Sequence, residues 1–471
     1  MMKKNLTILF SNLQQIKSIL QFSPHEINSE NGKSNERYRR ILLTGGTTAI
    51  VKVFSALINL FTVPLTLHYL GSEQYGLWMA ISSFMVLMNF ADLGLGIGLL
   101  NAISKANGME NIRLAQIAVS STFYMLLAIS LVLLSCFLII YPHIIWSEVF
   151  NARSAIAIRE SGPTMFVLVM VFLINMPLGV VQRIQDGYQD GFKFQVWQIV
   201  GTIISLIGLL FCIYLKLGLP WLVLFFSSGQ LIATFLNGYV LFYKQRISLR
   251  PRFKYFDFST SKKLLNSGVI YFILILFTLI GNSSDNIVLA HTMGAASVAG
   301  YEIVKKIFLF SMFTQFIIQP LWPAFGEAIA KKDYNWASRT LKKAMKLSIL
   351  IGAIMSLPLL LFGKQIINLW VGPDLVPSWS LLLGFYFYIL ISNYGGVMST
   401  FLNSGEMVKK QLIIVGLSSI SSIFLKIFLS IYFGVSGVIW ATVIGYSIFY
   451  IIPTYKISSN YFKNKLNGRD Q

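Results

Sequence analysis

The sequence predicts an all-α integral membrane protein with twelve transmembrane helices in two pseudo-symmetric six-helix lobes around a central cavity. Hydrophobic residues make up 55% of the 471 residues and charged residues only 12%, which is too apolar for an ordinary soluble chain. Apolar windows of about twenty residues, the length that crosses a bilayer as a helix, recur between Ile41 and Tyr455. These windows are continuous rather than alternating, so helices are favoured over a transmembrane barrel.

Charged residues and breaks at Gly, Pro or Asn separate the apolar runs into the expected spans. The first six lie near 41–68, 77–104, 115–141, 162–187, 196–217 and 219–243. The second six lie near 264–291, 297–325, 344–363, 379–403, 411–433 and 435–457. The predicted divisions are an N-terminal arm at 1–40, an N-lobe at 41–243, a basic linker at 244–263, a C-lobe at 264–457 and a tail at 458–471.

The placement of Lys and Arg predicts the orientation in the membrane. The formal net charge is +20, and 29 of the 38 basic residues lie in the arm, the tail and every second loop, whereas only four lie in the alternate loops. Cytoplasmic segments carry such an excess of Lys and Arg, so both termini are expected in the cytoplasm. Polar residues Asn12, Gln14 and Gln15 interrupt the start of the chain, which predicts an uncleaved arm rather than a signal peptide. The charge therefore indicates membrane orientation and not nucleic-acid binding.

No motif predicts catalysis or a metal site. The two cysteines, Cys136 and Cys212, lie within apolar segments and are expected to be packing residues. Zinc-protease, Walker and dinucleotide motifs are absent from the sequence, and the longest expected outer loop, 141–162, has no nucleophile, acid and base together. We therefore expect a protein that is not an enzyme and needs no cofactor.

The two halves of the sequence resemble each other. The segment "LGLPWLVLFFSSGQLI" at 217–232 has a similar pattern of glycine and apolar residues to "FGVSGVIWATVIGYSI" at 433–448. A shared H-x-x-G motif lies at the end of the first and of the seventh expected span. The repeat of about 220 residues contains an even number of spans, so both copies run in the same direction. Parallel repeats are typical of transporters in which two bundles rock around a cavity, although simple duplication of a membrane scaffold would leave the same pattern.

The second span and its approach resemble a known transporter family. The sequence "YLGSEQYGLWMAISSFMVLMNFADLGLGIGLLNAISKANG" at 69–108 is similar to the polysaccharide transporter family of the multidrug/oligosaccharidyl-lipid/polysaccharide (MOP) exporter superfamily, whose Wzx-type members are O-antigen and capsule flippases. The likeness continues through "LWVGPD" at 369–374 and "GVSGVIWATVIGY" at 434–446. These motifs are loose glycine and apolar patterns, so they indicate the family and not the substrate.

The resemblance implies a function in polysaccharide assembly. It implies two lobes around a V-shaped cavity that moves an undecaprenyl-diphosphate-linked glycan across the bacterial inner membrane, for O-antigen, capsule or exopolysaccharide assembly. Membrane lipids are implied partners, and a polysaccharide polymerase and chain-length proteins are further candidates. Two alternatives stay open within the superfamily: a multidrug exporter, and an exporter of peptidoglycan-type precursors, whose family typically has fourteen spans.

Asp92 is a candidate site residue because it lies near the middle of the expected second span. A charge at the centre of a membrane helix costs about 2.5 to 3.5 kcal/mol on insertion scales, and Asp is too short to reach the interface. Lys52, about 16 Å along the first span at 1.5 Å per residue, is its suggested counter-charge. The alternative is a cavity acid that binds a coupling ion or a proton. For Gly94 and Gly98 we prefer close helix packing.

The remaining intramembrane charges form a small positive excess. Lys305 and Lys306 follow Glu302 by three and four residues, so one local ion pair is expected and one lysine is left over. Lys426 has no acid at helical spacing, and Asp285 is expected to reach the headgroups near the outer end of its span. If they line one cavity, the lysines would suit a diphosphate headgroup, because ammonium groups pair with phosphate oxygens without strict geometry.

Overall fold

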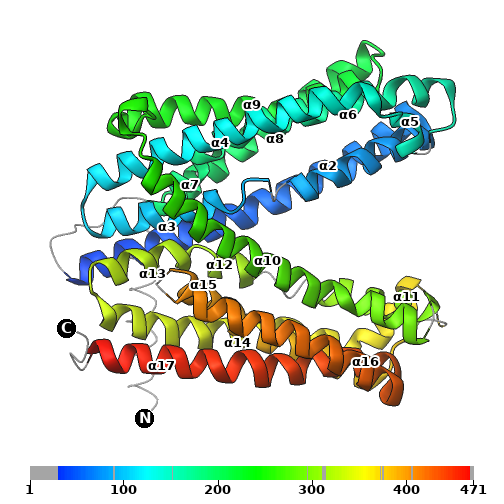
Figure 1. The fold of residues 1–471 in the computed structure, drawn as a ribbon. Coiled ribbons are helices and arrows are strands. Elements are labelled where there is room, and N and C mark those ends of the chain that lie inside the picture. The colour runs from blue at the N-terminus through cyan, green and yellow to red at the C-terminus, as the bar shows by residue number, and fades with distance from the viewer. Residues whose placement is uncertain are drawn as a thin grey trace, which may run out of the picture. The chain divides into compact units, whose positions relative to one another are not determined.

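A computed structural model describes residues 30–88, 91–150, 152–293, 295–309, 314–371, 373, 376–404 and 407–466. These residues form helices and no strands, and nine of the helical segments found among them are long and apolar enough to cross a membrane (Figure 1). The chain forms two units, residues 42–269 and residues 1–41 with 270–471. Most of the predicted arm, 1–29, and the end of the predicted tail, 467–471, lie outside the described residues. The protein is thus an all-helical, multi-pass membrane protein.

The unit 42–269 is built mainly from long apolar helices with short connections. It contains most of α2 (Glu30–Met88), α3 (Leu95–Gly108), α4 (Ile112–Ile140), η1 (Tyr141–His143), α5 (Trp146–Val149), α6 (Ala155–Leu178), α7 (Val180–Gly187), α8 (Gly191–Tyr214), α9 (Leu219–Val240), the π-helical turn η2 (Leu241–Gln245), η3 (Ile247–Leu249), η4 (Phe253–Tyr255) and the start of α10 (Phe258–Met293). We call it the N-terminal unit.

The second unit, here the C-terminal unit, combines residues 270–471 with the segment before Leu42. It contains the first residues of α2, most of α10, α11 (Ala295–Leu309), α12 (Thr314–Ile318), α13 (Leu321–Ala330), α14 (Tyr334–Val371), α15 (Trp379–Ser404), α16 (Val408–Tyr446), the π-helical turn η7 (Ser447–Ile451) and α17 (Ile452–Leu466). In Figure 1 the first residues of α2 are blue, and the elements from α10 to α17 run from green through yellow and orange to red.

Two breaks inside long helices lie where the sequence predicts a boundary between spans. Gly71, between the first two expected spans, interrupts α2 with φ 75° and ψ 170°. Gly434, between the last two, interrupts α16 with φ 63° and ψ −147°. Both glycines adopt a positive φ that side chains disfavour. The chain therefore turns at these two points within one residue rather than through an extended loop.

The second expected span, 77–104, is not one continuous helix, and the prediction of continuity is wrong. Helix α2 ends at Met88, residues 91–94 form turns, and α3 begins at Leu95. Leu93 and Gly94 have φ values of 50° and 76°, outside the helical region. Gly94 also packs directly against the backbone of Gly268 in α10, so a side chain there would collide with a main chain that cannot move aside. Packing, which the sequence predicts for Gly94 and Gly98, is confirmed, because Gly98 faces Leu264 of the same helix.

The eighth expected span, 297–325, is also discontinuous. It consists of α11, α12 and α13, and Pro320 occupies the position before α13. Proline has no N–H group to continue a preceding helix, which explains why the chain breaks there. The second span of each sequence repeat is therefore interrupted, as in transporters whose binding sites involve broken helices.

The outward surfaces of the helices are apolar and the packed surfaces carry small residues. In α4, Ala118, Ser121 and Ser130 are buried, whereas Val132 is 61% exposed and Ile139 is 68% exposed. This distribution is the reverse of that in a soluble protein. It is expected where lipid surrounds the helices, because small residues allow close helix packing and large apolar residues face the acyl chains.

Residues 244–263, the predicted linker, pack on α4 within the N-terminal unit. Ser120 Oγ and Ser121 Oγ accept hydrogen bonds from the backbone N–H groups of Arg252 and Asp257, at 3.2 and 3.1 Å. The Asp257 side chain in turn caps α10 by accepting from the Thr260 hydroxyl and N–H, at 2.5 and 2.7 Å. These hydrogen bonds hold the pKa of Asp257 below its ordinary value, because they favour the charged carboxylate.

The first turns of α2 dock on α13 and α14 in the C-terminal unit. Arg37, 4% exposed, lies 3.0 Å from Asp333 Oδ2 and 3.5 Å from Glu327 Oε1, and its guanidinium stacks 4.8 Å from the centre of the Trp336 ring. Tyr38 hydrogen-bonds Thr340 at 2.8 Å. Arginine suits such a site because its planar group can pair with carboxylates and stack at the same time.

We predict that Gly94→Ala destabilises the protein. A non-glycine residue in the left-handed region costs about 1 to 2 kcal/mol before any steric effect, and the Cβ would also meet the Gly268 backbone. The measurement is the melting temperature of the purified protein in detergent. Gly46→Ala in α2 is the matched control, since nothing lies within 4 Å of the added Cβ. Equal melting temperatures for the two variants would contradict the prediction.

Candidate functional site

A buried ion-pair cluster lies among α10, α11 and α16 of the C-terminal unit. Its members are Asp285, Tyr301, Glu302, Lys305 and Lys426. Lys426 Nζ lies 2.6 Å from Asp285 Oδ1, and the Lys426 side chain is fully buried. The Tyr301 hydroxyl donates to Asp285 Oδ2 at 2.8 Å. A buried charge needs a partner of opposite charge, and Lys426 and Asp285 provide this for each other.

Close packing of α10 against α16 makes room for this pair. Gly281 faces Ser419, where an added Cβ would come within 3.0 Å of Oγ, and Ser419 Oγ donates to the Phe277 carbonyl at 2.9 Å. Lys426 lies two turns further along α16 and donates to the Gly281 carbonyl at 2.6 Å and to Ser284 Oγ at 3.0 Å. Two hydrogen bonds and the ion pair with Asp285 together hold the ammonium group.

Lys305 is the more accessible cation of the cluster. Its ammonium group lies 3.4 Å from Glu302 Oε1 and 3.7 Å from Asp285 Oδ2, with the side chain 30% exposed. Asn286 also donates to Glu302 Oε1, at 2.9 Å. Two lysines therefore balance two carboxylates, and Lys306, exposed on the next position of α11, adds one positive charge. In this conformation an anion could contact Lys305 and Lys306 but not Lys426.

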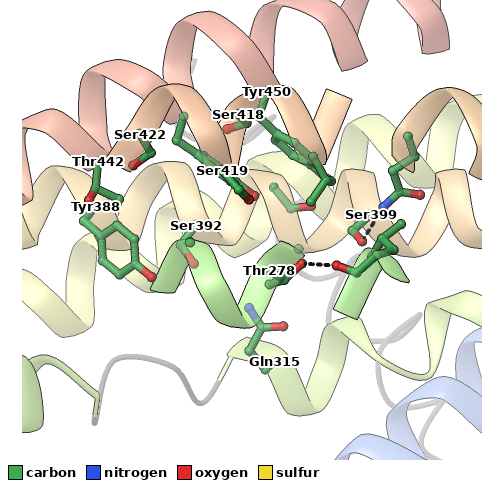
Figure 2. Close-up of a pocket in the computed structure, with 17 residues that line it drawn as sticks. Thr278, Gln315, Tyr388, Ser392, Ser399, Ser418, Ser419, Ser422, Thr442 and Tyr450 are labelled. Carbon is green, nitrogen blue, oxygen red and sulfur yellow. Dashed lines mark hydrogen bonds between the residues drawn. The ribbon is translucent and has the colours of Figure 1, made fainter. Parts of the chain in front are cut away.

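A polar cavity of about 230 Å³ lies beside this cluster, within the C-terminal unit. Side chains from α10, α12, α15, α16 and η7 converge on it (Figure 2). Serine, threonine, tyrosine and glutamine supply most of its polar lining, which consists of Thr278, Gln315, Tyr388, Ser392, Ser399, Gln411, Ser418, Ser419, Ser422, Thr442, Tyr446 and Tyr450. Gly281 also lines the cavity, and its carbonyl accepts the hydrogen bond from Lys426, so the ion-pair cluster and the cavity are adjacent.

In the N-terminal unit, Asp92 caps the interrupted helix α3. Asp92 Oδ1 accepts from the Gly94 N–H at 2.9 Å and Oδ2 accepts from the Gly96 N–H at 3.3 Å. Arg183 of α7 approaches the same place, because a Cβ added at Gly96 would lie 2.9 Å from Arg183 Nε and 3.0 Å from Asp92 Oδ2. A carboxylate is stabilised there by free N–H groups and by the helix dipole.

Comparison with known proteins identifies the family. The model of a family described as "Polysaccharide biosynthesis protein" matches residues 44–329, more than half of the chain. The chain belongs to this family. A second family model, MatE, matches residues 270–431.

Curated relatives of this protein carry names that refer to O-antigen transport. A protein of Salmonella typhimurium named as an O-antigen transporter is 23% identical over 441 residues, which cover 89% of this chain and 97% of the relative. A protein of Yersinia pseudotuberculosis named as an O-antigen export protein is 23% identical over 415 residues, covering 84% of this chain and 91% of the relative.

Solved structures with a similar fold are transporters of the MOP superfamily. An outward-facing multidrug resistance transporter of the MATE family aligns with a TM-score of 0.75 at 16% identity, covering 91% of this chain and 96% of that chain. A MOP superfamily transporter from Pyrococcus furiosus aligns with a TM-score of 0.73 at 16% identity over the same shares. Together with the family match and the names of the relatives, these likenesses indicate a membrane transporter of the MOP superfamily.

In this member of the polysaccharide biosynthesis family, the structure brings only some of the site residues predicted from the sequence into contact. The expected local ion pair on α11 is confirmed for Glu302 and Lys305. The expectation that Asp285 reaches the headgroups is wrong, because Asp285 is 6% exposed and paired with Lys426. Its partner lies on another helix, which is why helical spacing on α16 could not reveal it.

Asp92 and Lys52 do not form the suggested pair. Lys52 is exposed on α2 and has no ion pair with any residue that the structure describes. Asp92 is not at the middle of a continuous helix but in the turn before α3, where backbone N–H groups bind it. Lys426, fully buried and paired with Asp285, is not an accessible cation. The shared cavity of the four lysines stays a prediction.

Two features of the site are not among the candidates from the sequence. Arg183 lies near the end of the expected span 162–187, and its side chain reaches the Asp92 turn. The polar cavity was also missed, because serine and tyrosine are common in membrane helices and carry no charge signal. The run Ser418, Ser419 and Ser422 on one face of α16 is the feature that could have indicated it.

We predict that Lys426→Met strongly destabilises the protein and that Asp285→Leu in the same chain restores much of the loss. Removing one member of a buried pair leaves an uncompensated charge and costs about 3 to 5 kcal/mol, whereas replacing both charges by apolar groups is often neutral. Melting in detergent of the single and double variants measures the coupling. Lys306→Met, on an exposed position, is the control. Additive losses in the double variant would contradict the pairing.

Proposed function

We propose that the protein is a flippase that moves a polyprenyl-diphosphate-linked oligosaccharide across the bacterial inner membrane, for O-antigen, capsule or exopolysaccharide assembly. The observation that carries this proposal is the family match over residues 44–329, joined to relatives named as O-antigen transporters along 91 to 97% of their own length. The relatives' names describe those proteins, and their extension to this chain is the proposal.

The architecture proposed for this activity is the twelve-span arrangement with two lobes and both termini in the cytoplasm. The excess of Lys and Arg in the expected cytoplasmic segments supports that orientation. Alternating exposure of a cavity would move the headgroup, with a proton or sodium gradient or later polymerisation of the glycan as the energy source. A polysaccharide polymerase and chain-length proteins are the proposed partners.

The cations of the C-terminal unit support an anionic cargo. Lys305 and Lys306 are the two lysines of α11, one partly and one largely accessible, beside a cluster that is otherwise charge-balanced. Two adjacent ammonium groups can bind diphosphate oxygens through charge-assisted hydrogen bonds. An exporter of cationic drugs would instead favour unpaired carboxylates, and both acids of this cluster are held by lysines.

Multidrug export is the second candidate function. The MatE match at residues 270–431 and the fold likeness to a multidrug resistance transporter favour it. The two functions differ in what accumulates when the protein is lost.

Deletion of the protein in its host separates the two candidates. For a flippase, lipid-linked repeat units accumulate on the cytoplasmic leaflet and surface glycan is lost, with unchanged drug susceptibility. Leaflet location is measured by the accessibility of the glycan to an impermeant enzyme, in inside-out and right-side-out vesicles. Increased drug susceptibility without glycan accumulation would reject the flippase proposal in favour of drug export.

The double variant Lys305→Gln, Lys306→Gln is expected to reduce surface glycan by at least about tenfold in the complemented deletion strain. A hydrogen bond to a charged group contributes about 1.5 to 3 kcal/mol, which corresponds to about a tenfold to hundredfold effect. Lys342→Gln, an exposed lysine of α14, is the matched control for lost positive charge. Protein amount and melting temperature are measured alongside. Full surface glycan in the double variant would exclude a role for these lysines.

A further inference from the structure

The polar cavity of the C-terminal unit carries no ionisable acid or base beyond tyrosine. Twelve of its lining residues have a hydroxyl or amide group, and these groups are uncharged at neutral pH. The cavity lies inside a bundle whose outer surfaces are apolar, where each polar group has a cost unless it forms a hydrogen bond. Such a density of neutral donors and acceptors indicates a ligand, or a group of waters, that hydrogen-bonds in many directions.

Gln411 gives the strongest sign of a missing ligand. It is 1% exposed and lines the cavity from α16. Its amide nitrogen donates to Ser399 Oγ at 2.9 Å, whereas its Oε1 has no hydrogen-bond partner among the described residues. An unsatisfied buried carbonyl costs about 1 to 3 kcal/mol. A donor hydroxyl in the cavity would remove this cost.

Tyrosine rings provide the second part of the lining. Tyr446 and Tyr450 stack with ring centres 4.5 Å apart and an interplanar angle of 18°, and Tyr388 lines the cavity from α15. The rings add apolar surface to the lining, and their phenol hydroxyls can hydrogen-bond oxygen atoms of a ligand. Apolar surface and hydroxyl groups together match a molecule with C–H groups and a rim of hydroxyl groups.

We propose that this cavity binds one uncharged sugar ring of the cargo. The inference rests on the proposed function, because it takes the ring to be part of the lipid-linked oligosaccharide. A volume of about 230 Å³ is several times the share of one water in the liquid, about 30 Å³, so the cavity has room for a group larger than a few waters, such as one sugar ring. The ring occupies the neutral cavity, and the charged part of the cargo remains outside it.

Other occupants fit the lining less well. A lipid tail would leave the buried Gln411 Oε1 without a hydrogen-bond donor. A metal or organic cation would favour carboxylate ligands, and the lining residues include no Asp or Glu. A cluster of waters could form the same hydrogen bonds, but it would not explain the apolar surface of the three tyrosine rings. The experiment below distinguishes a bound sugar from bound water.

The test measures sugar binding to the purified full-length protein in detergent. Melting temperature is followed against neutral monosaccharides (glucose, galactose, mannose, rhamnose and N-acetylglucosamine) up to about 100 mM, two decades above a millimolar Kd. Binding to the folded state gives a saturable rise. Glucuronate serves as the charged analogue. Exclusion of sugars from the surface also stabilises proteins, but it acts without saturation and equally on all variants.

Gln411→Leu and Tyr446→Phe are the test variants, and Gln230→Leu is the matched control. Gln230 is an interhelical amide of the N-terminal unit, whose nitrogen donates to Thr202 Oγ1 at 3.1 Å. We expect at least one neutral sugar to give a saturable rise in the wild type and in Gln230→Leu. Its apparent Kd rises at least tenfold in Gln411→Leu and in Tyr446→Phe, and glucuronate gives no saturable rise.

Two results overturn the proposal: no saturable effect of any sugar in the wild type, which leaves water as the occupant, or an undiminished effect in both test variants. If Gln411→Leu does not fold, Tyr446→Phe, which removes only one oxygen atom, decides alone. This measurement is independent of transport. A protein that exports lipid-linked glycan but binds no sugar rejects only the cavity inference, whereas a protein that binds sugar but exports no glycan rejects the proposed function.

Discussion

The pair of Lys426 and Asp285 is the interaction around which the C-terminal unit is organised. A fully buried ammonium group is stable between apolar helices only if it is paired and hydrogen-bonded. The Gly281 carbonyl and Ser284 Oγ accept its hydrogen bonds, the Asp285 carboxylate is its ion-pair partner, and all three residues belong to α10. The contact therefore sets the register of α10 against α16. In this register Ser419 and Ser422, which precede Lys426 on α16, line the neighbouring cavity.

Hydropathy and charge placement could predict the class of the protein and the approximate position of its helices. Lipid imposes a simple rule, because a spanning segment must be long, apolar and internally hydrogen-bonded. The same rule does not predict where a helix is interrupted. Asp92 satisfies the free N–H groups of α3 after the break, but in the sequence it looks like a charge in a continuous apolar run. The left-handed backbone at Leu93 and Gly94 depends on the approach of Gly268, about 170 residues away along the chain.

Ion pairs within one helix could be predicted, and pairs between helices could not. Glu302 and Lys305 are three residues apart, and their contact follows from helical geometry. Lys426 and Asp285 are separated by 141 residues, so their contact depends on tertiary packing. Helical spacing alone counts Lys426 as a free cation, so it overestimates the positive charge within the membrane. The structure leaves Lys305 and Lys306 as the accessible cations of this region.

The two copies of the repeat share their backbone breaks but use their polar groups differently. In the N-terminal unit, the acid near the break caps a helix with its backbone N–H groups, and Arg183 lies beside it. In the C-terminal unit, Pro320 lies at the break and the acid is on a different helix, where it holds a lysine. A cap needs only local backbone, whereas a lysine pair needs two helices at a fixed distance. The consequence is a buried Lys426–Asp285 pair whose charges balance each other, so the proposed sugar site in the neutral cavity beside it recognises hydroxyl groups and not the charge of the cargo.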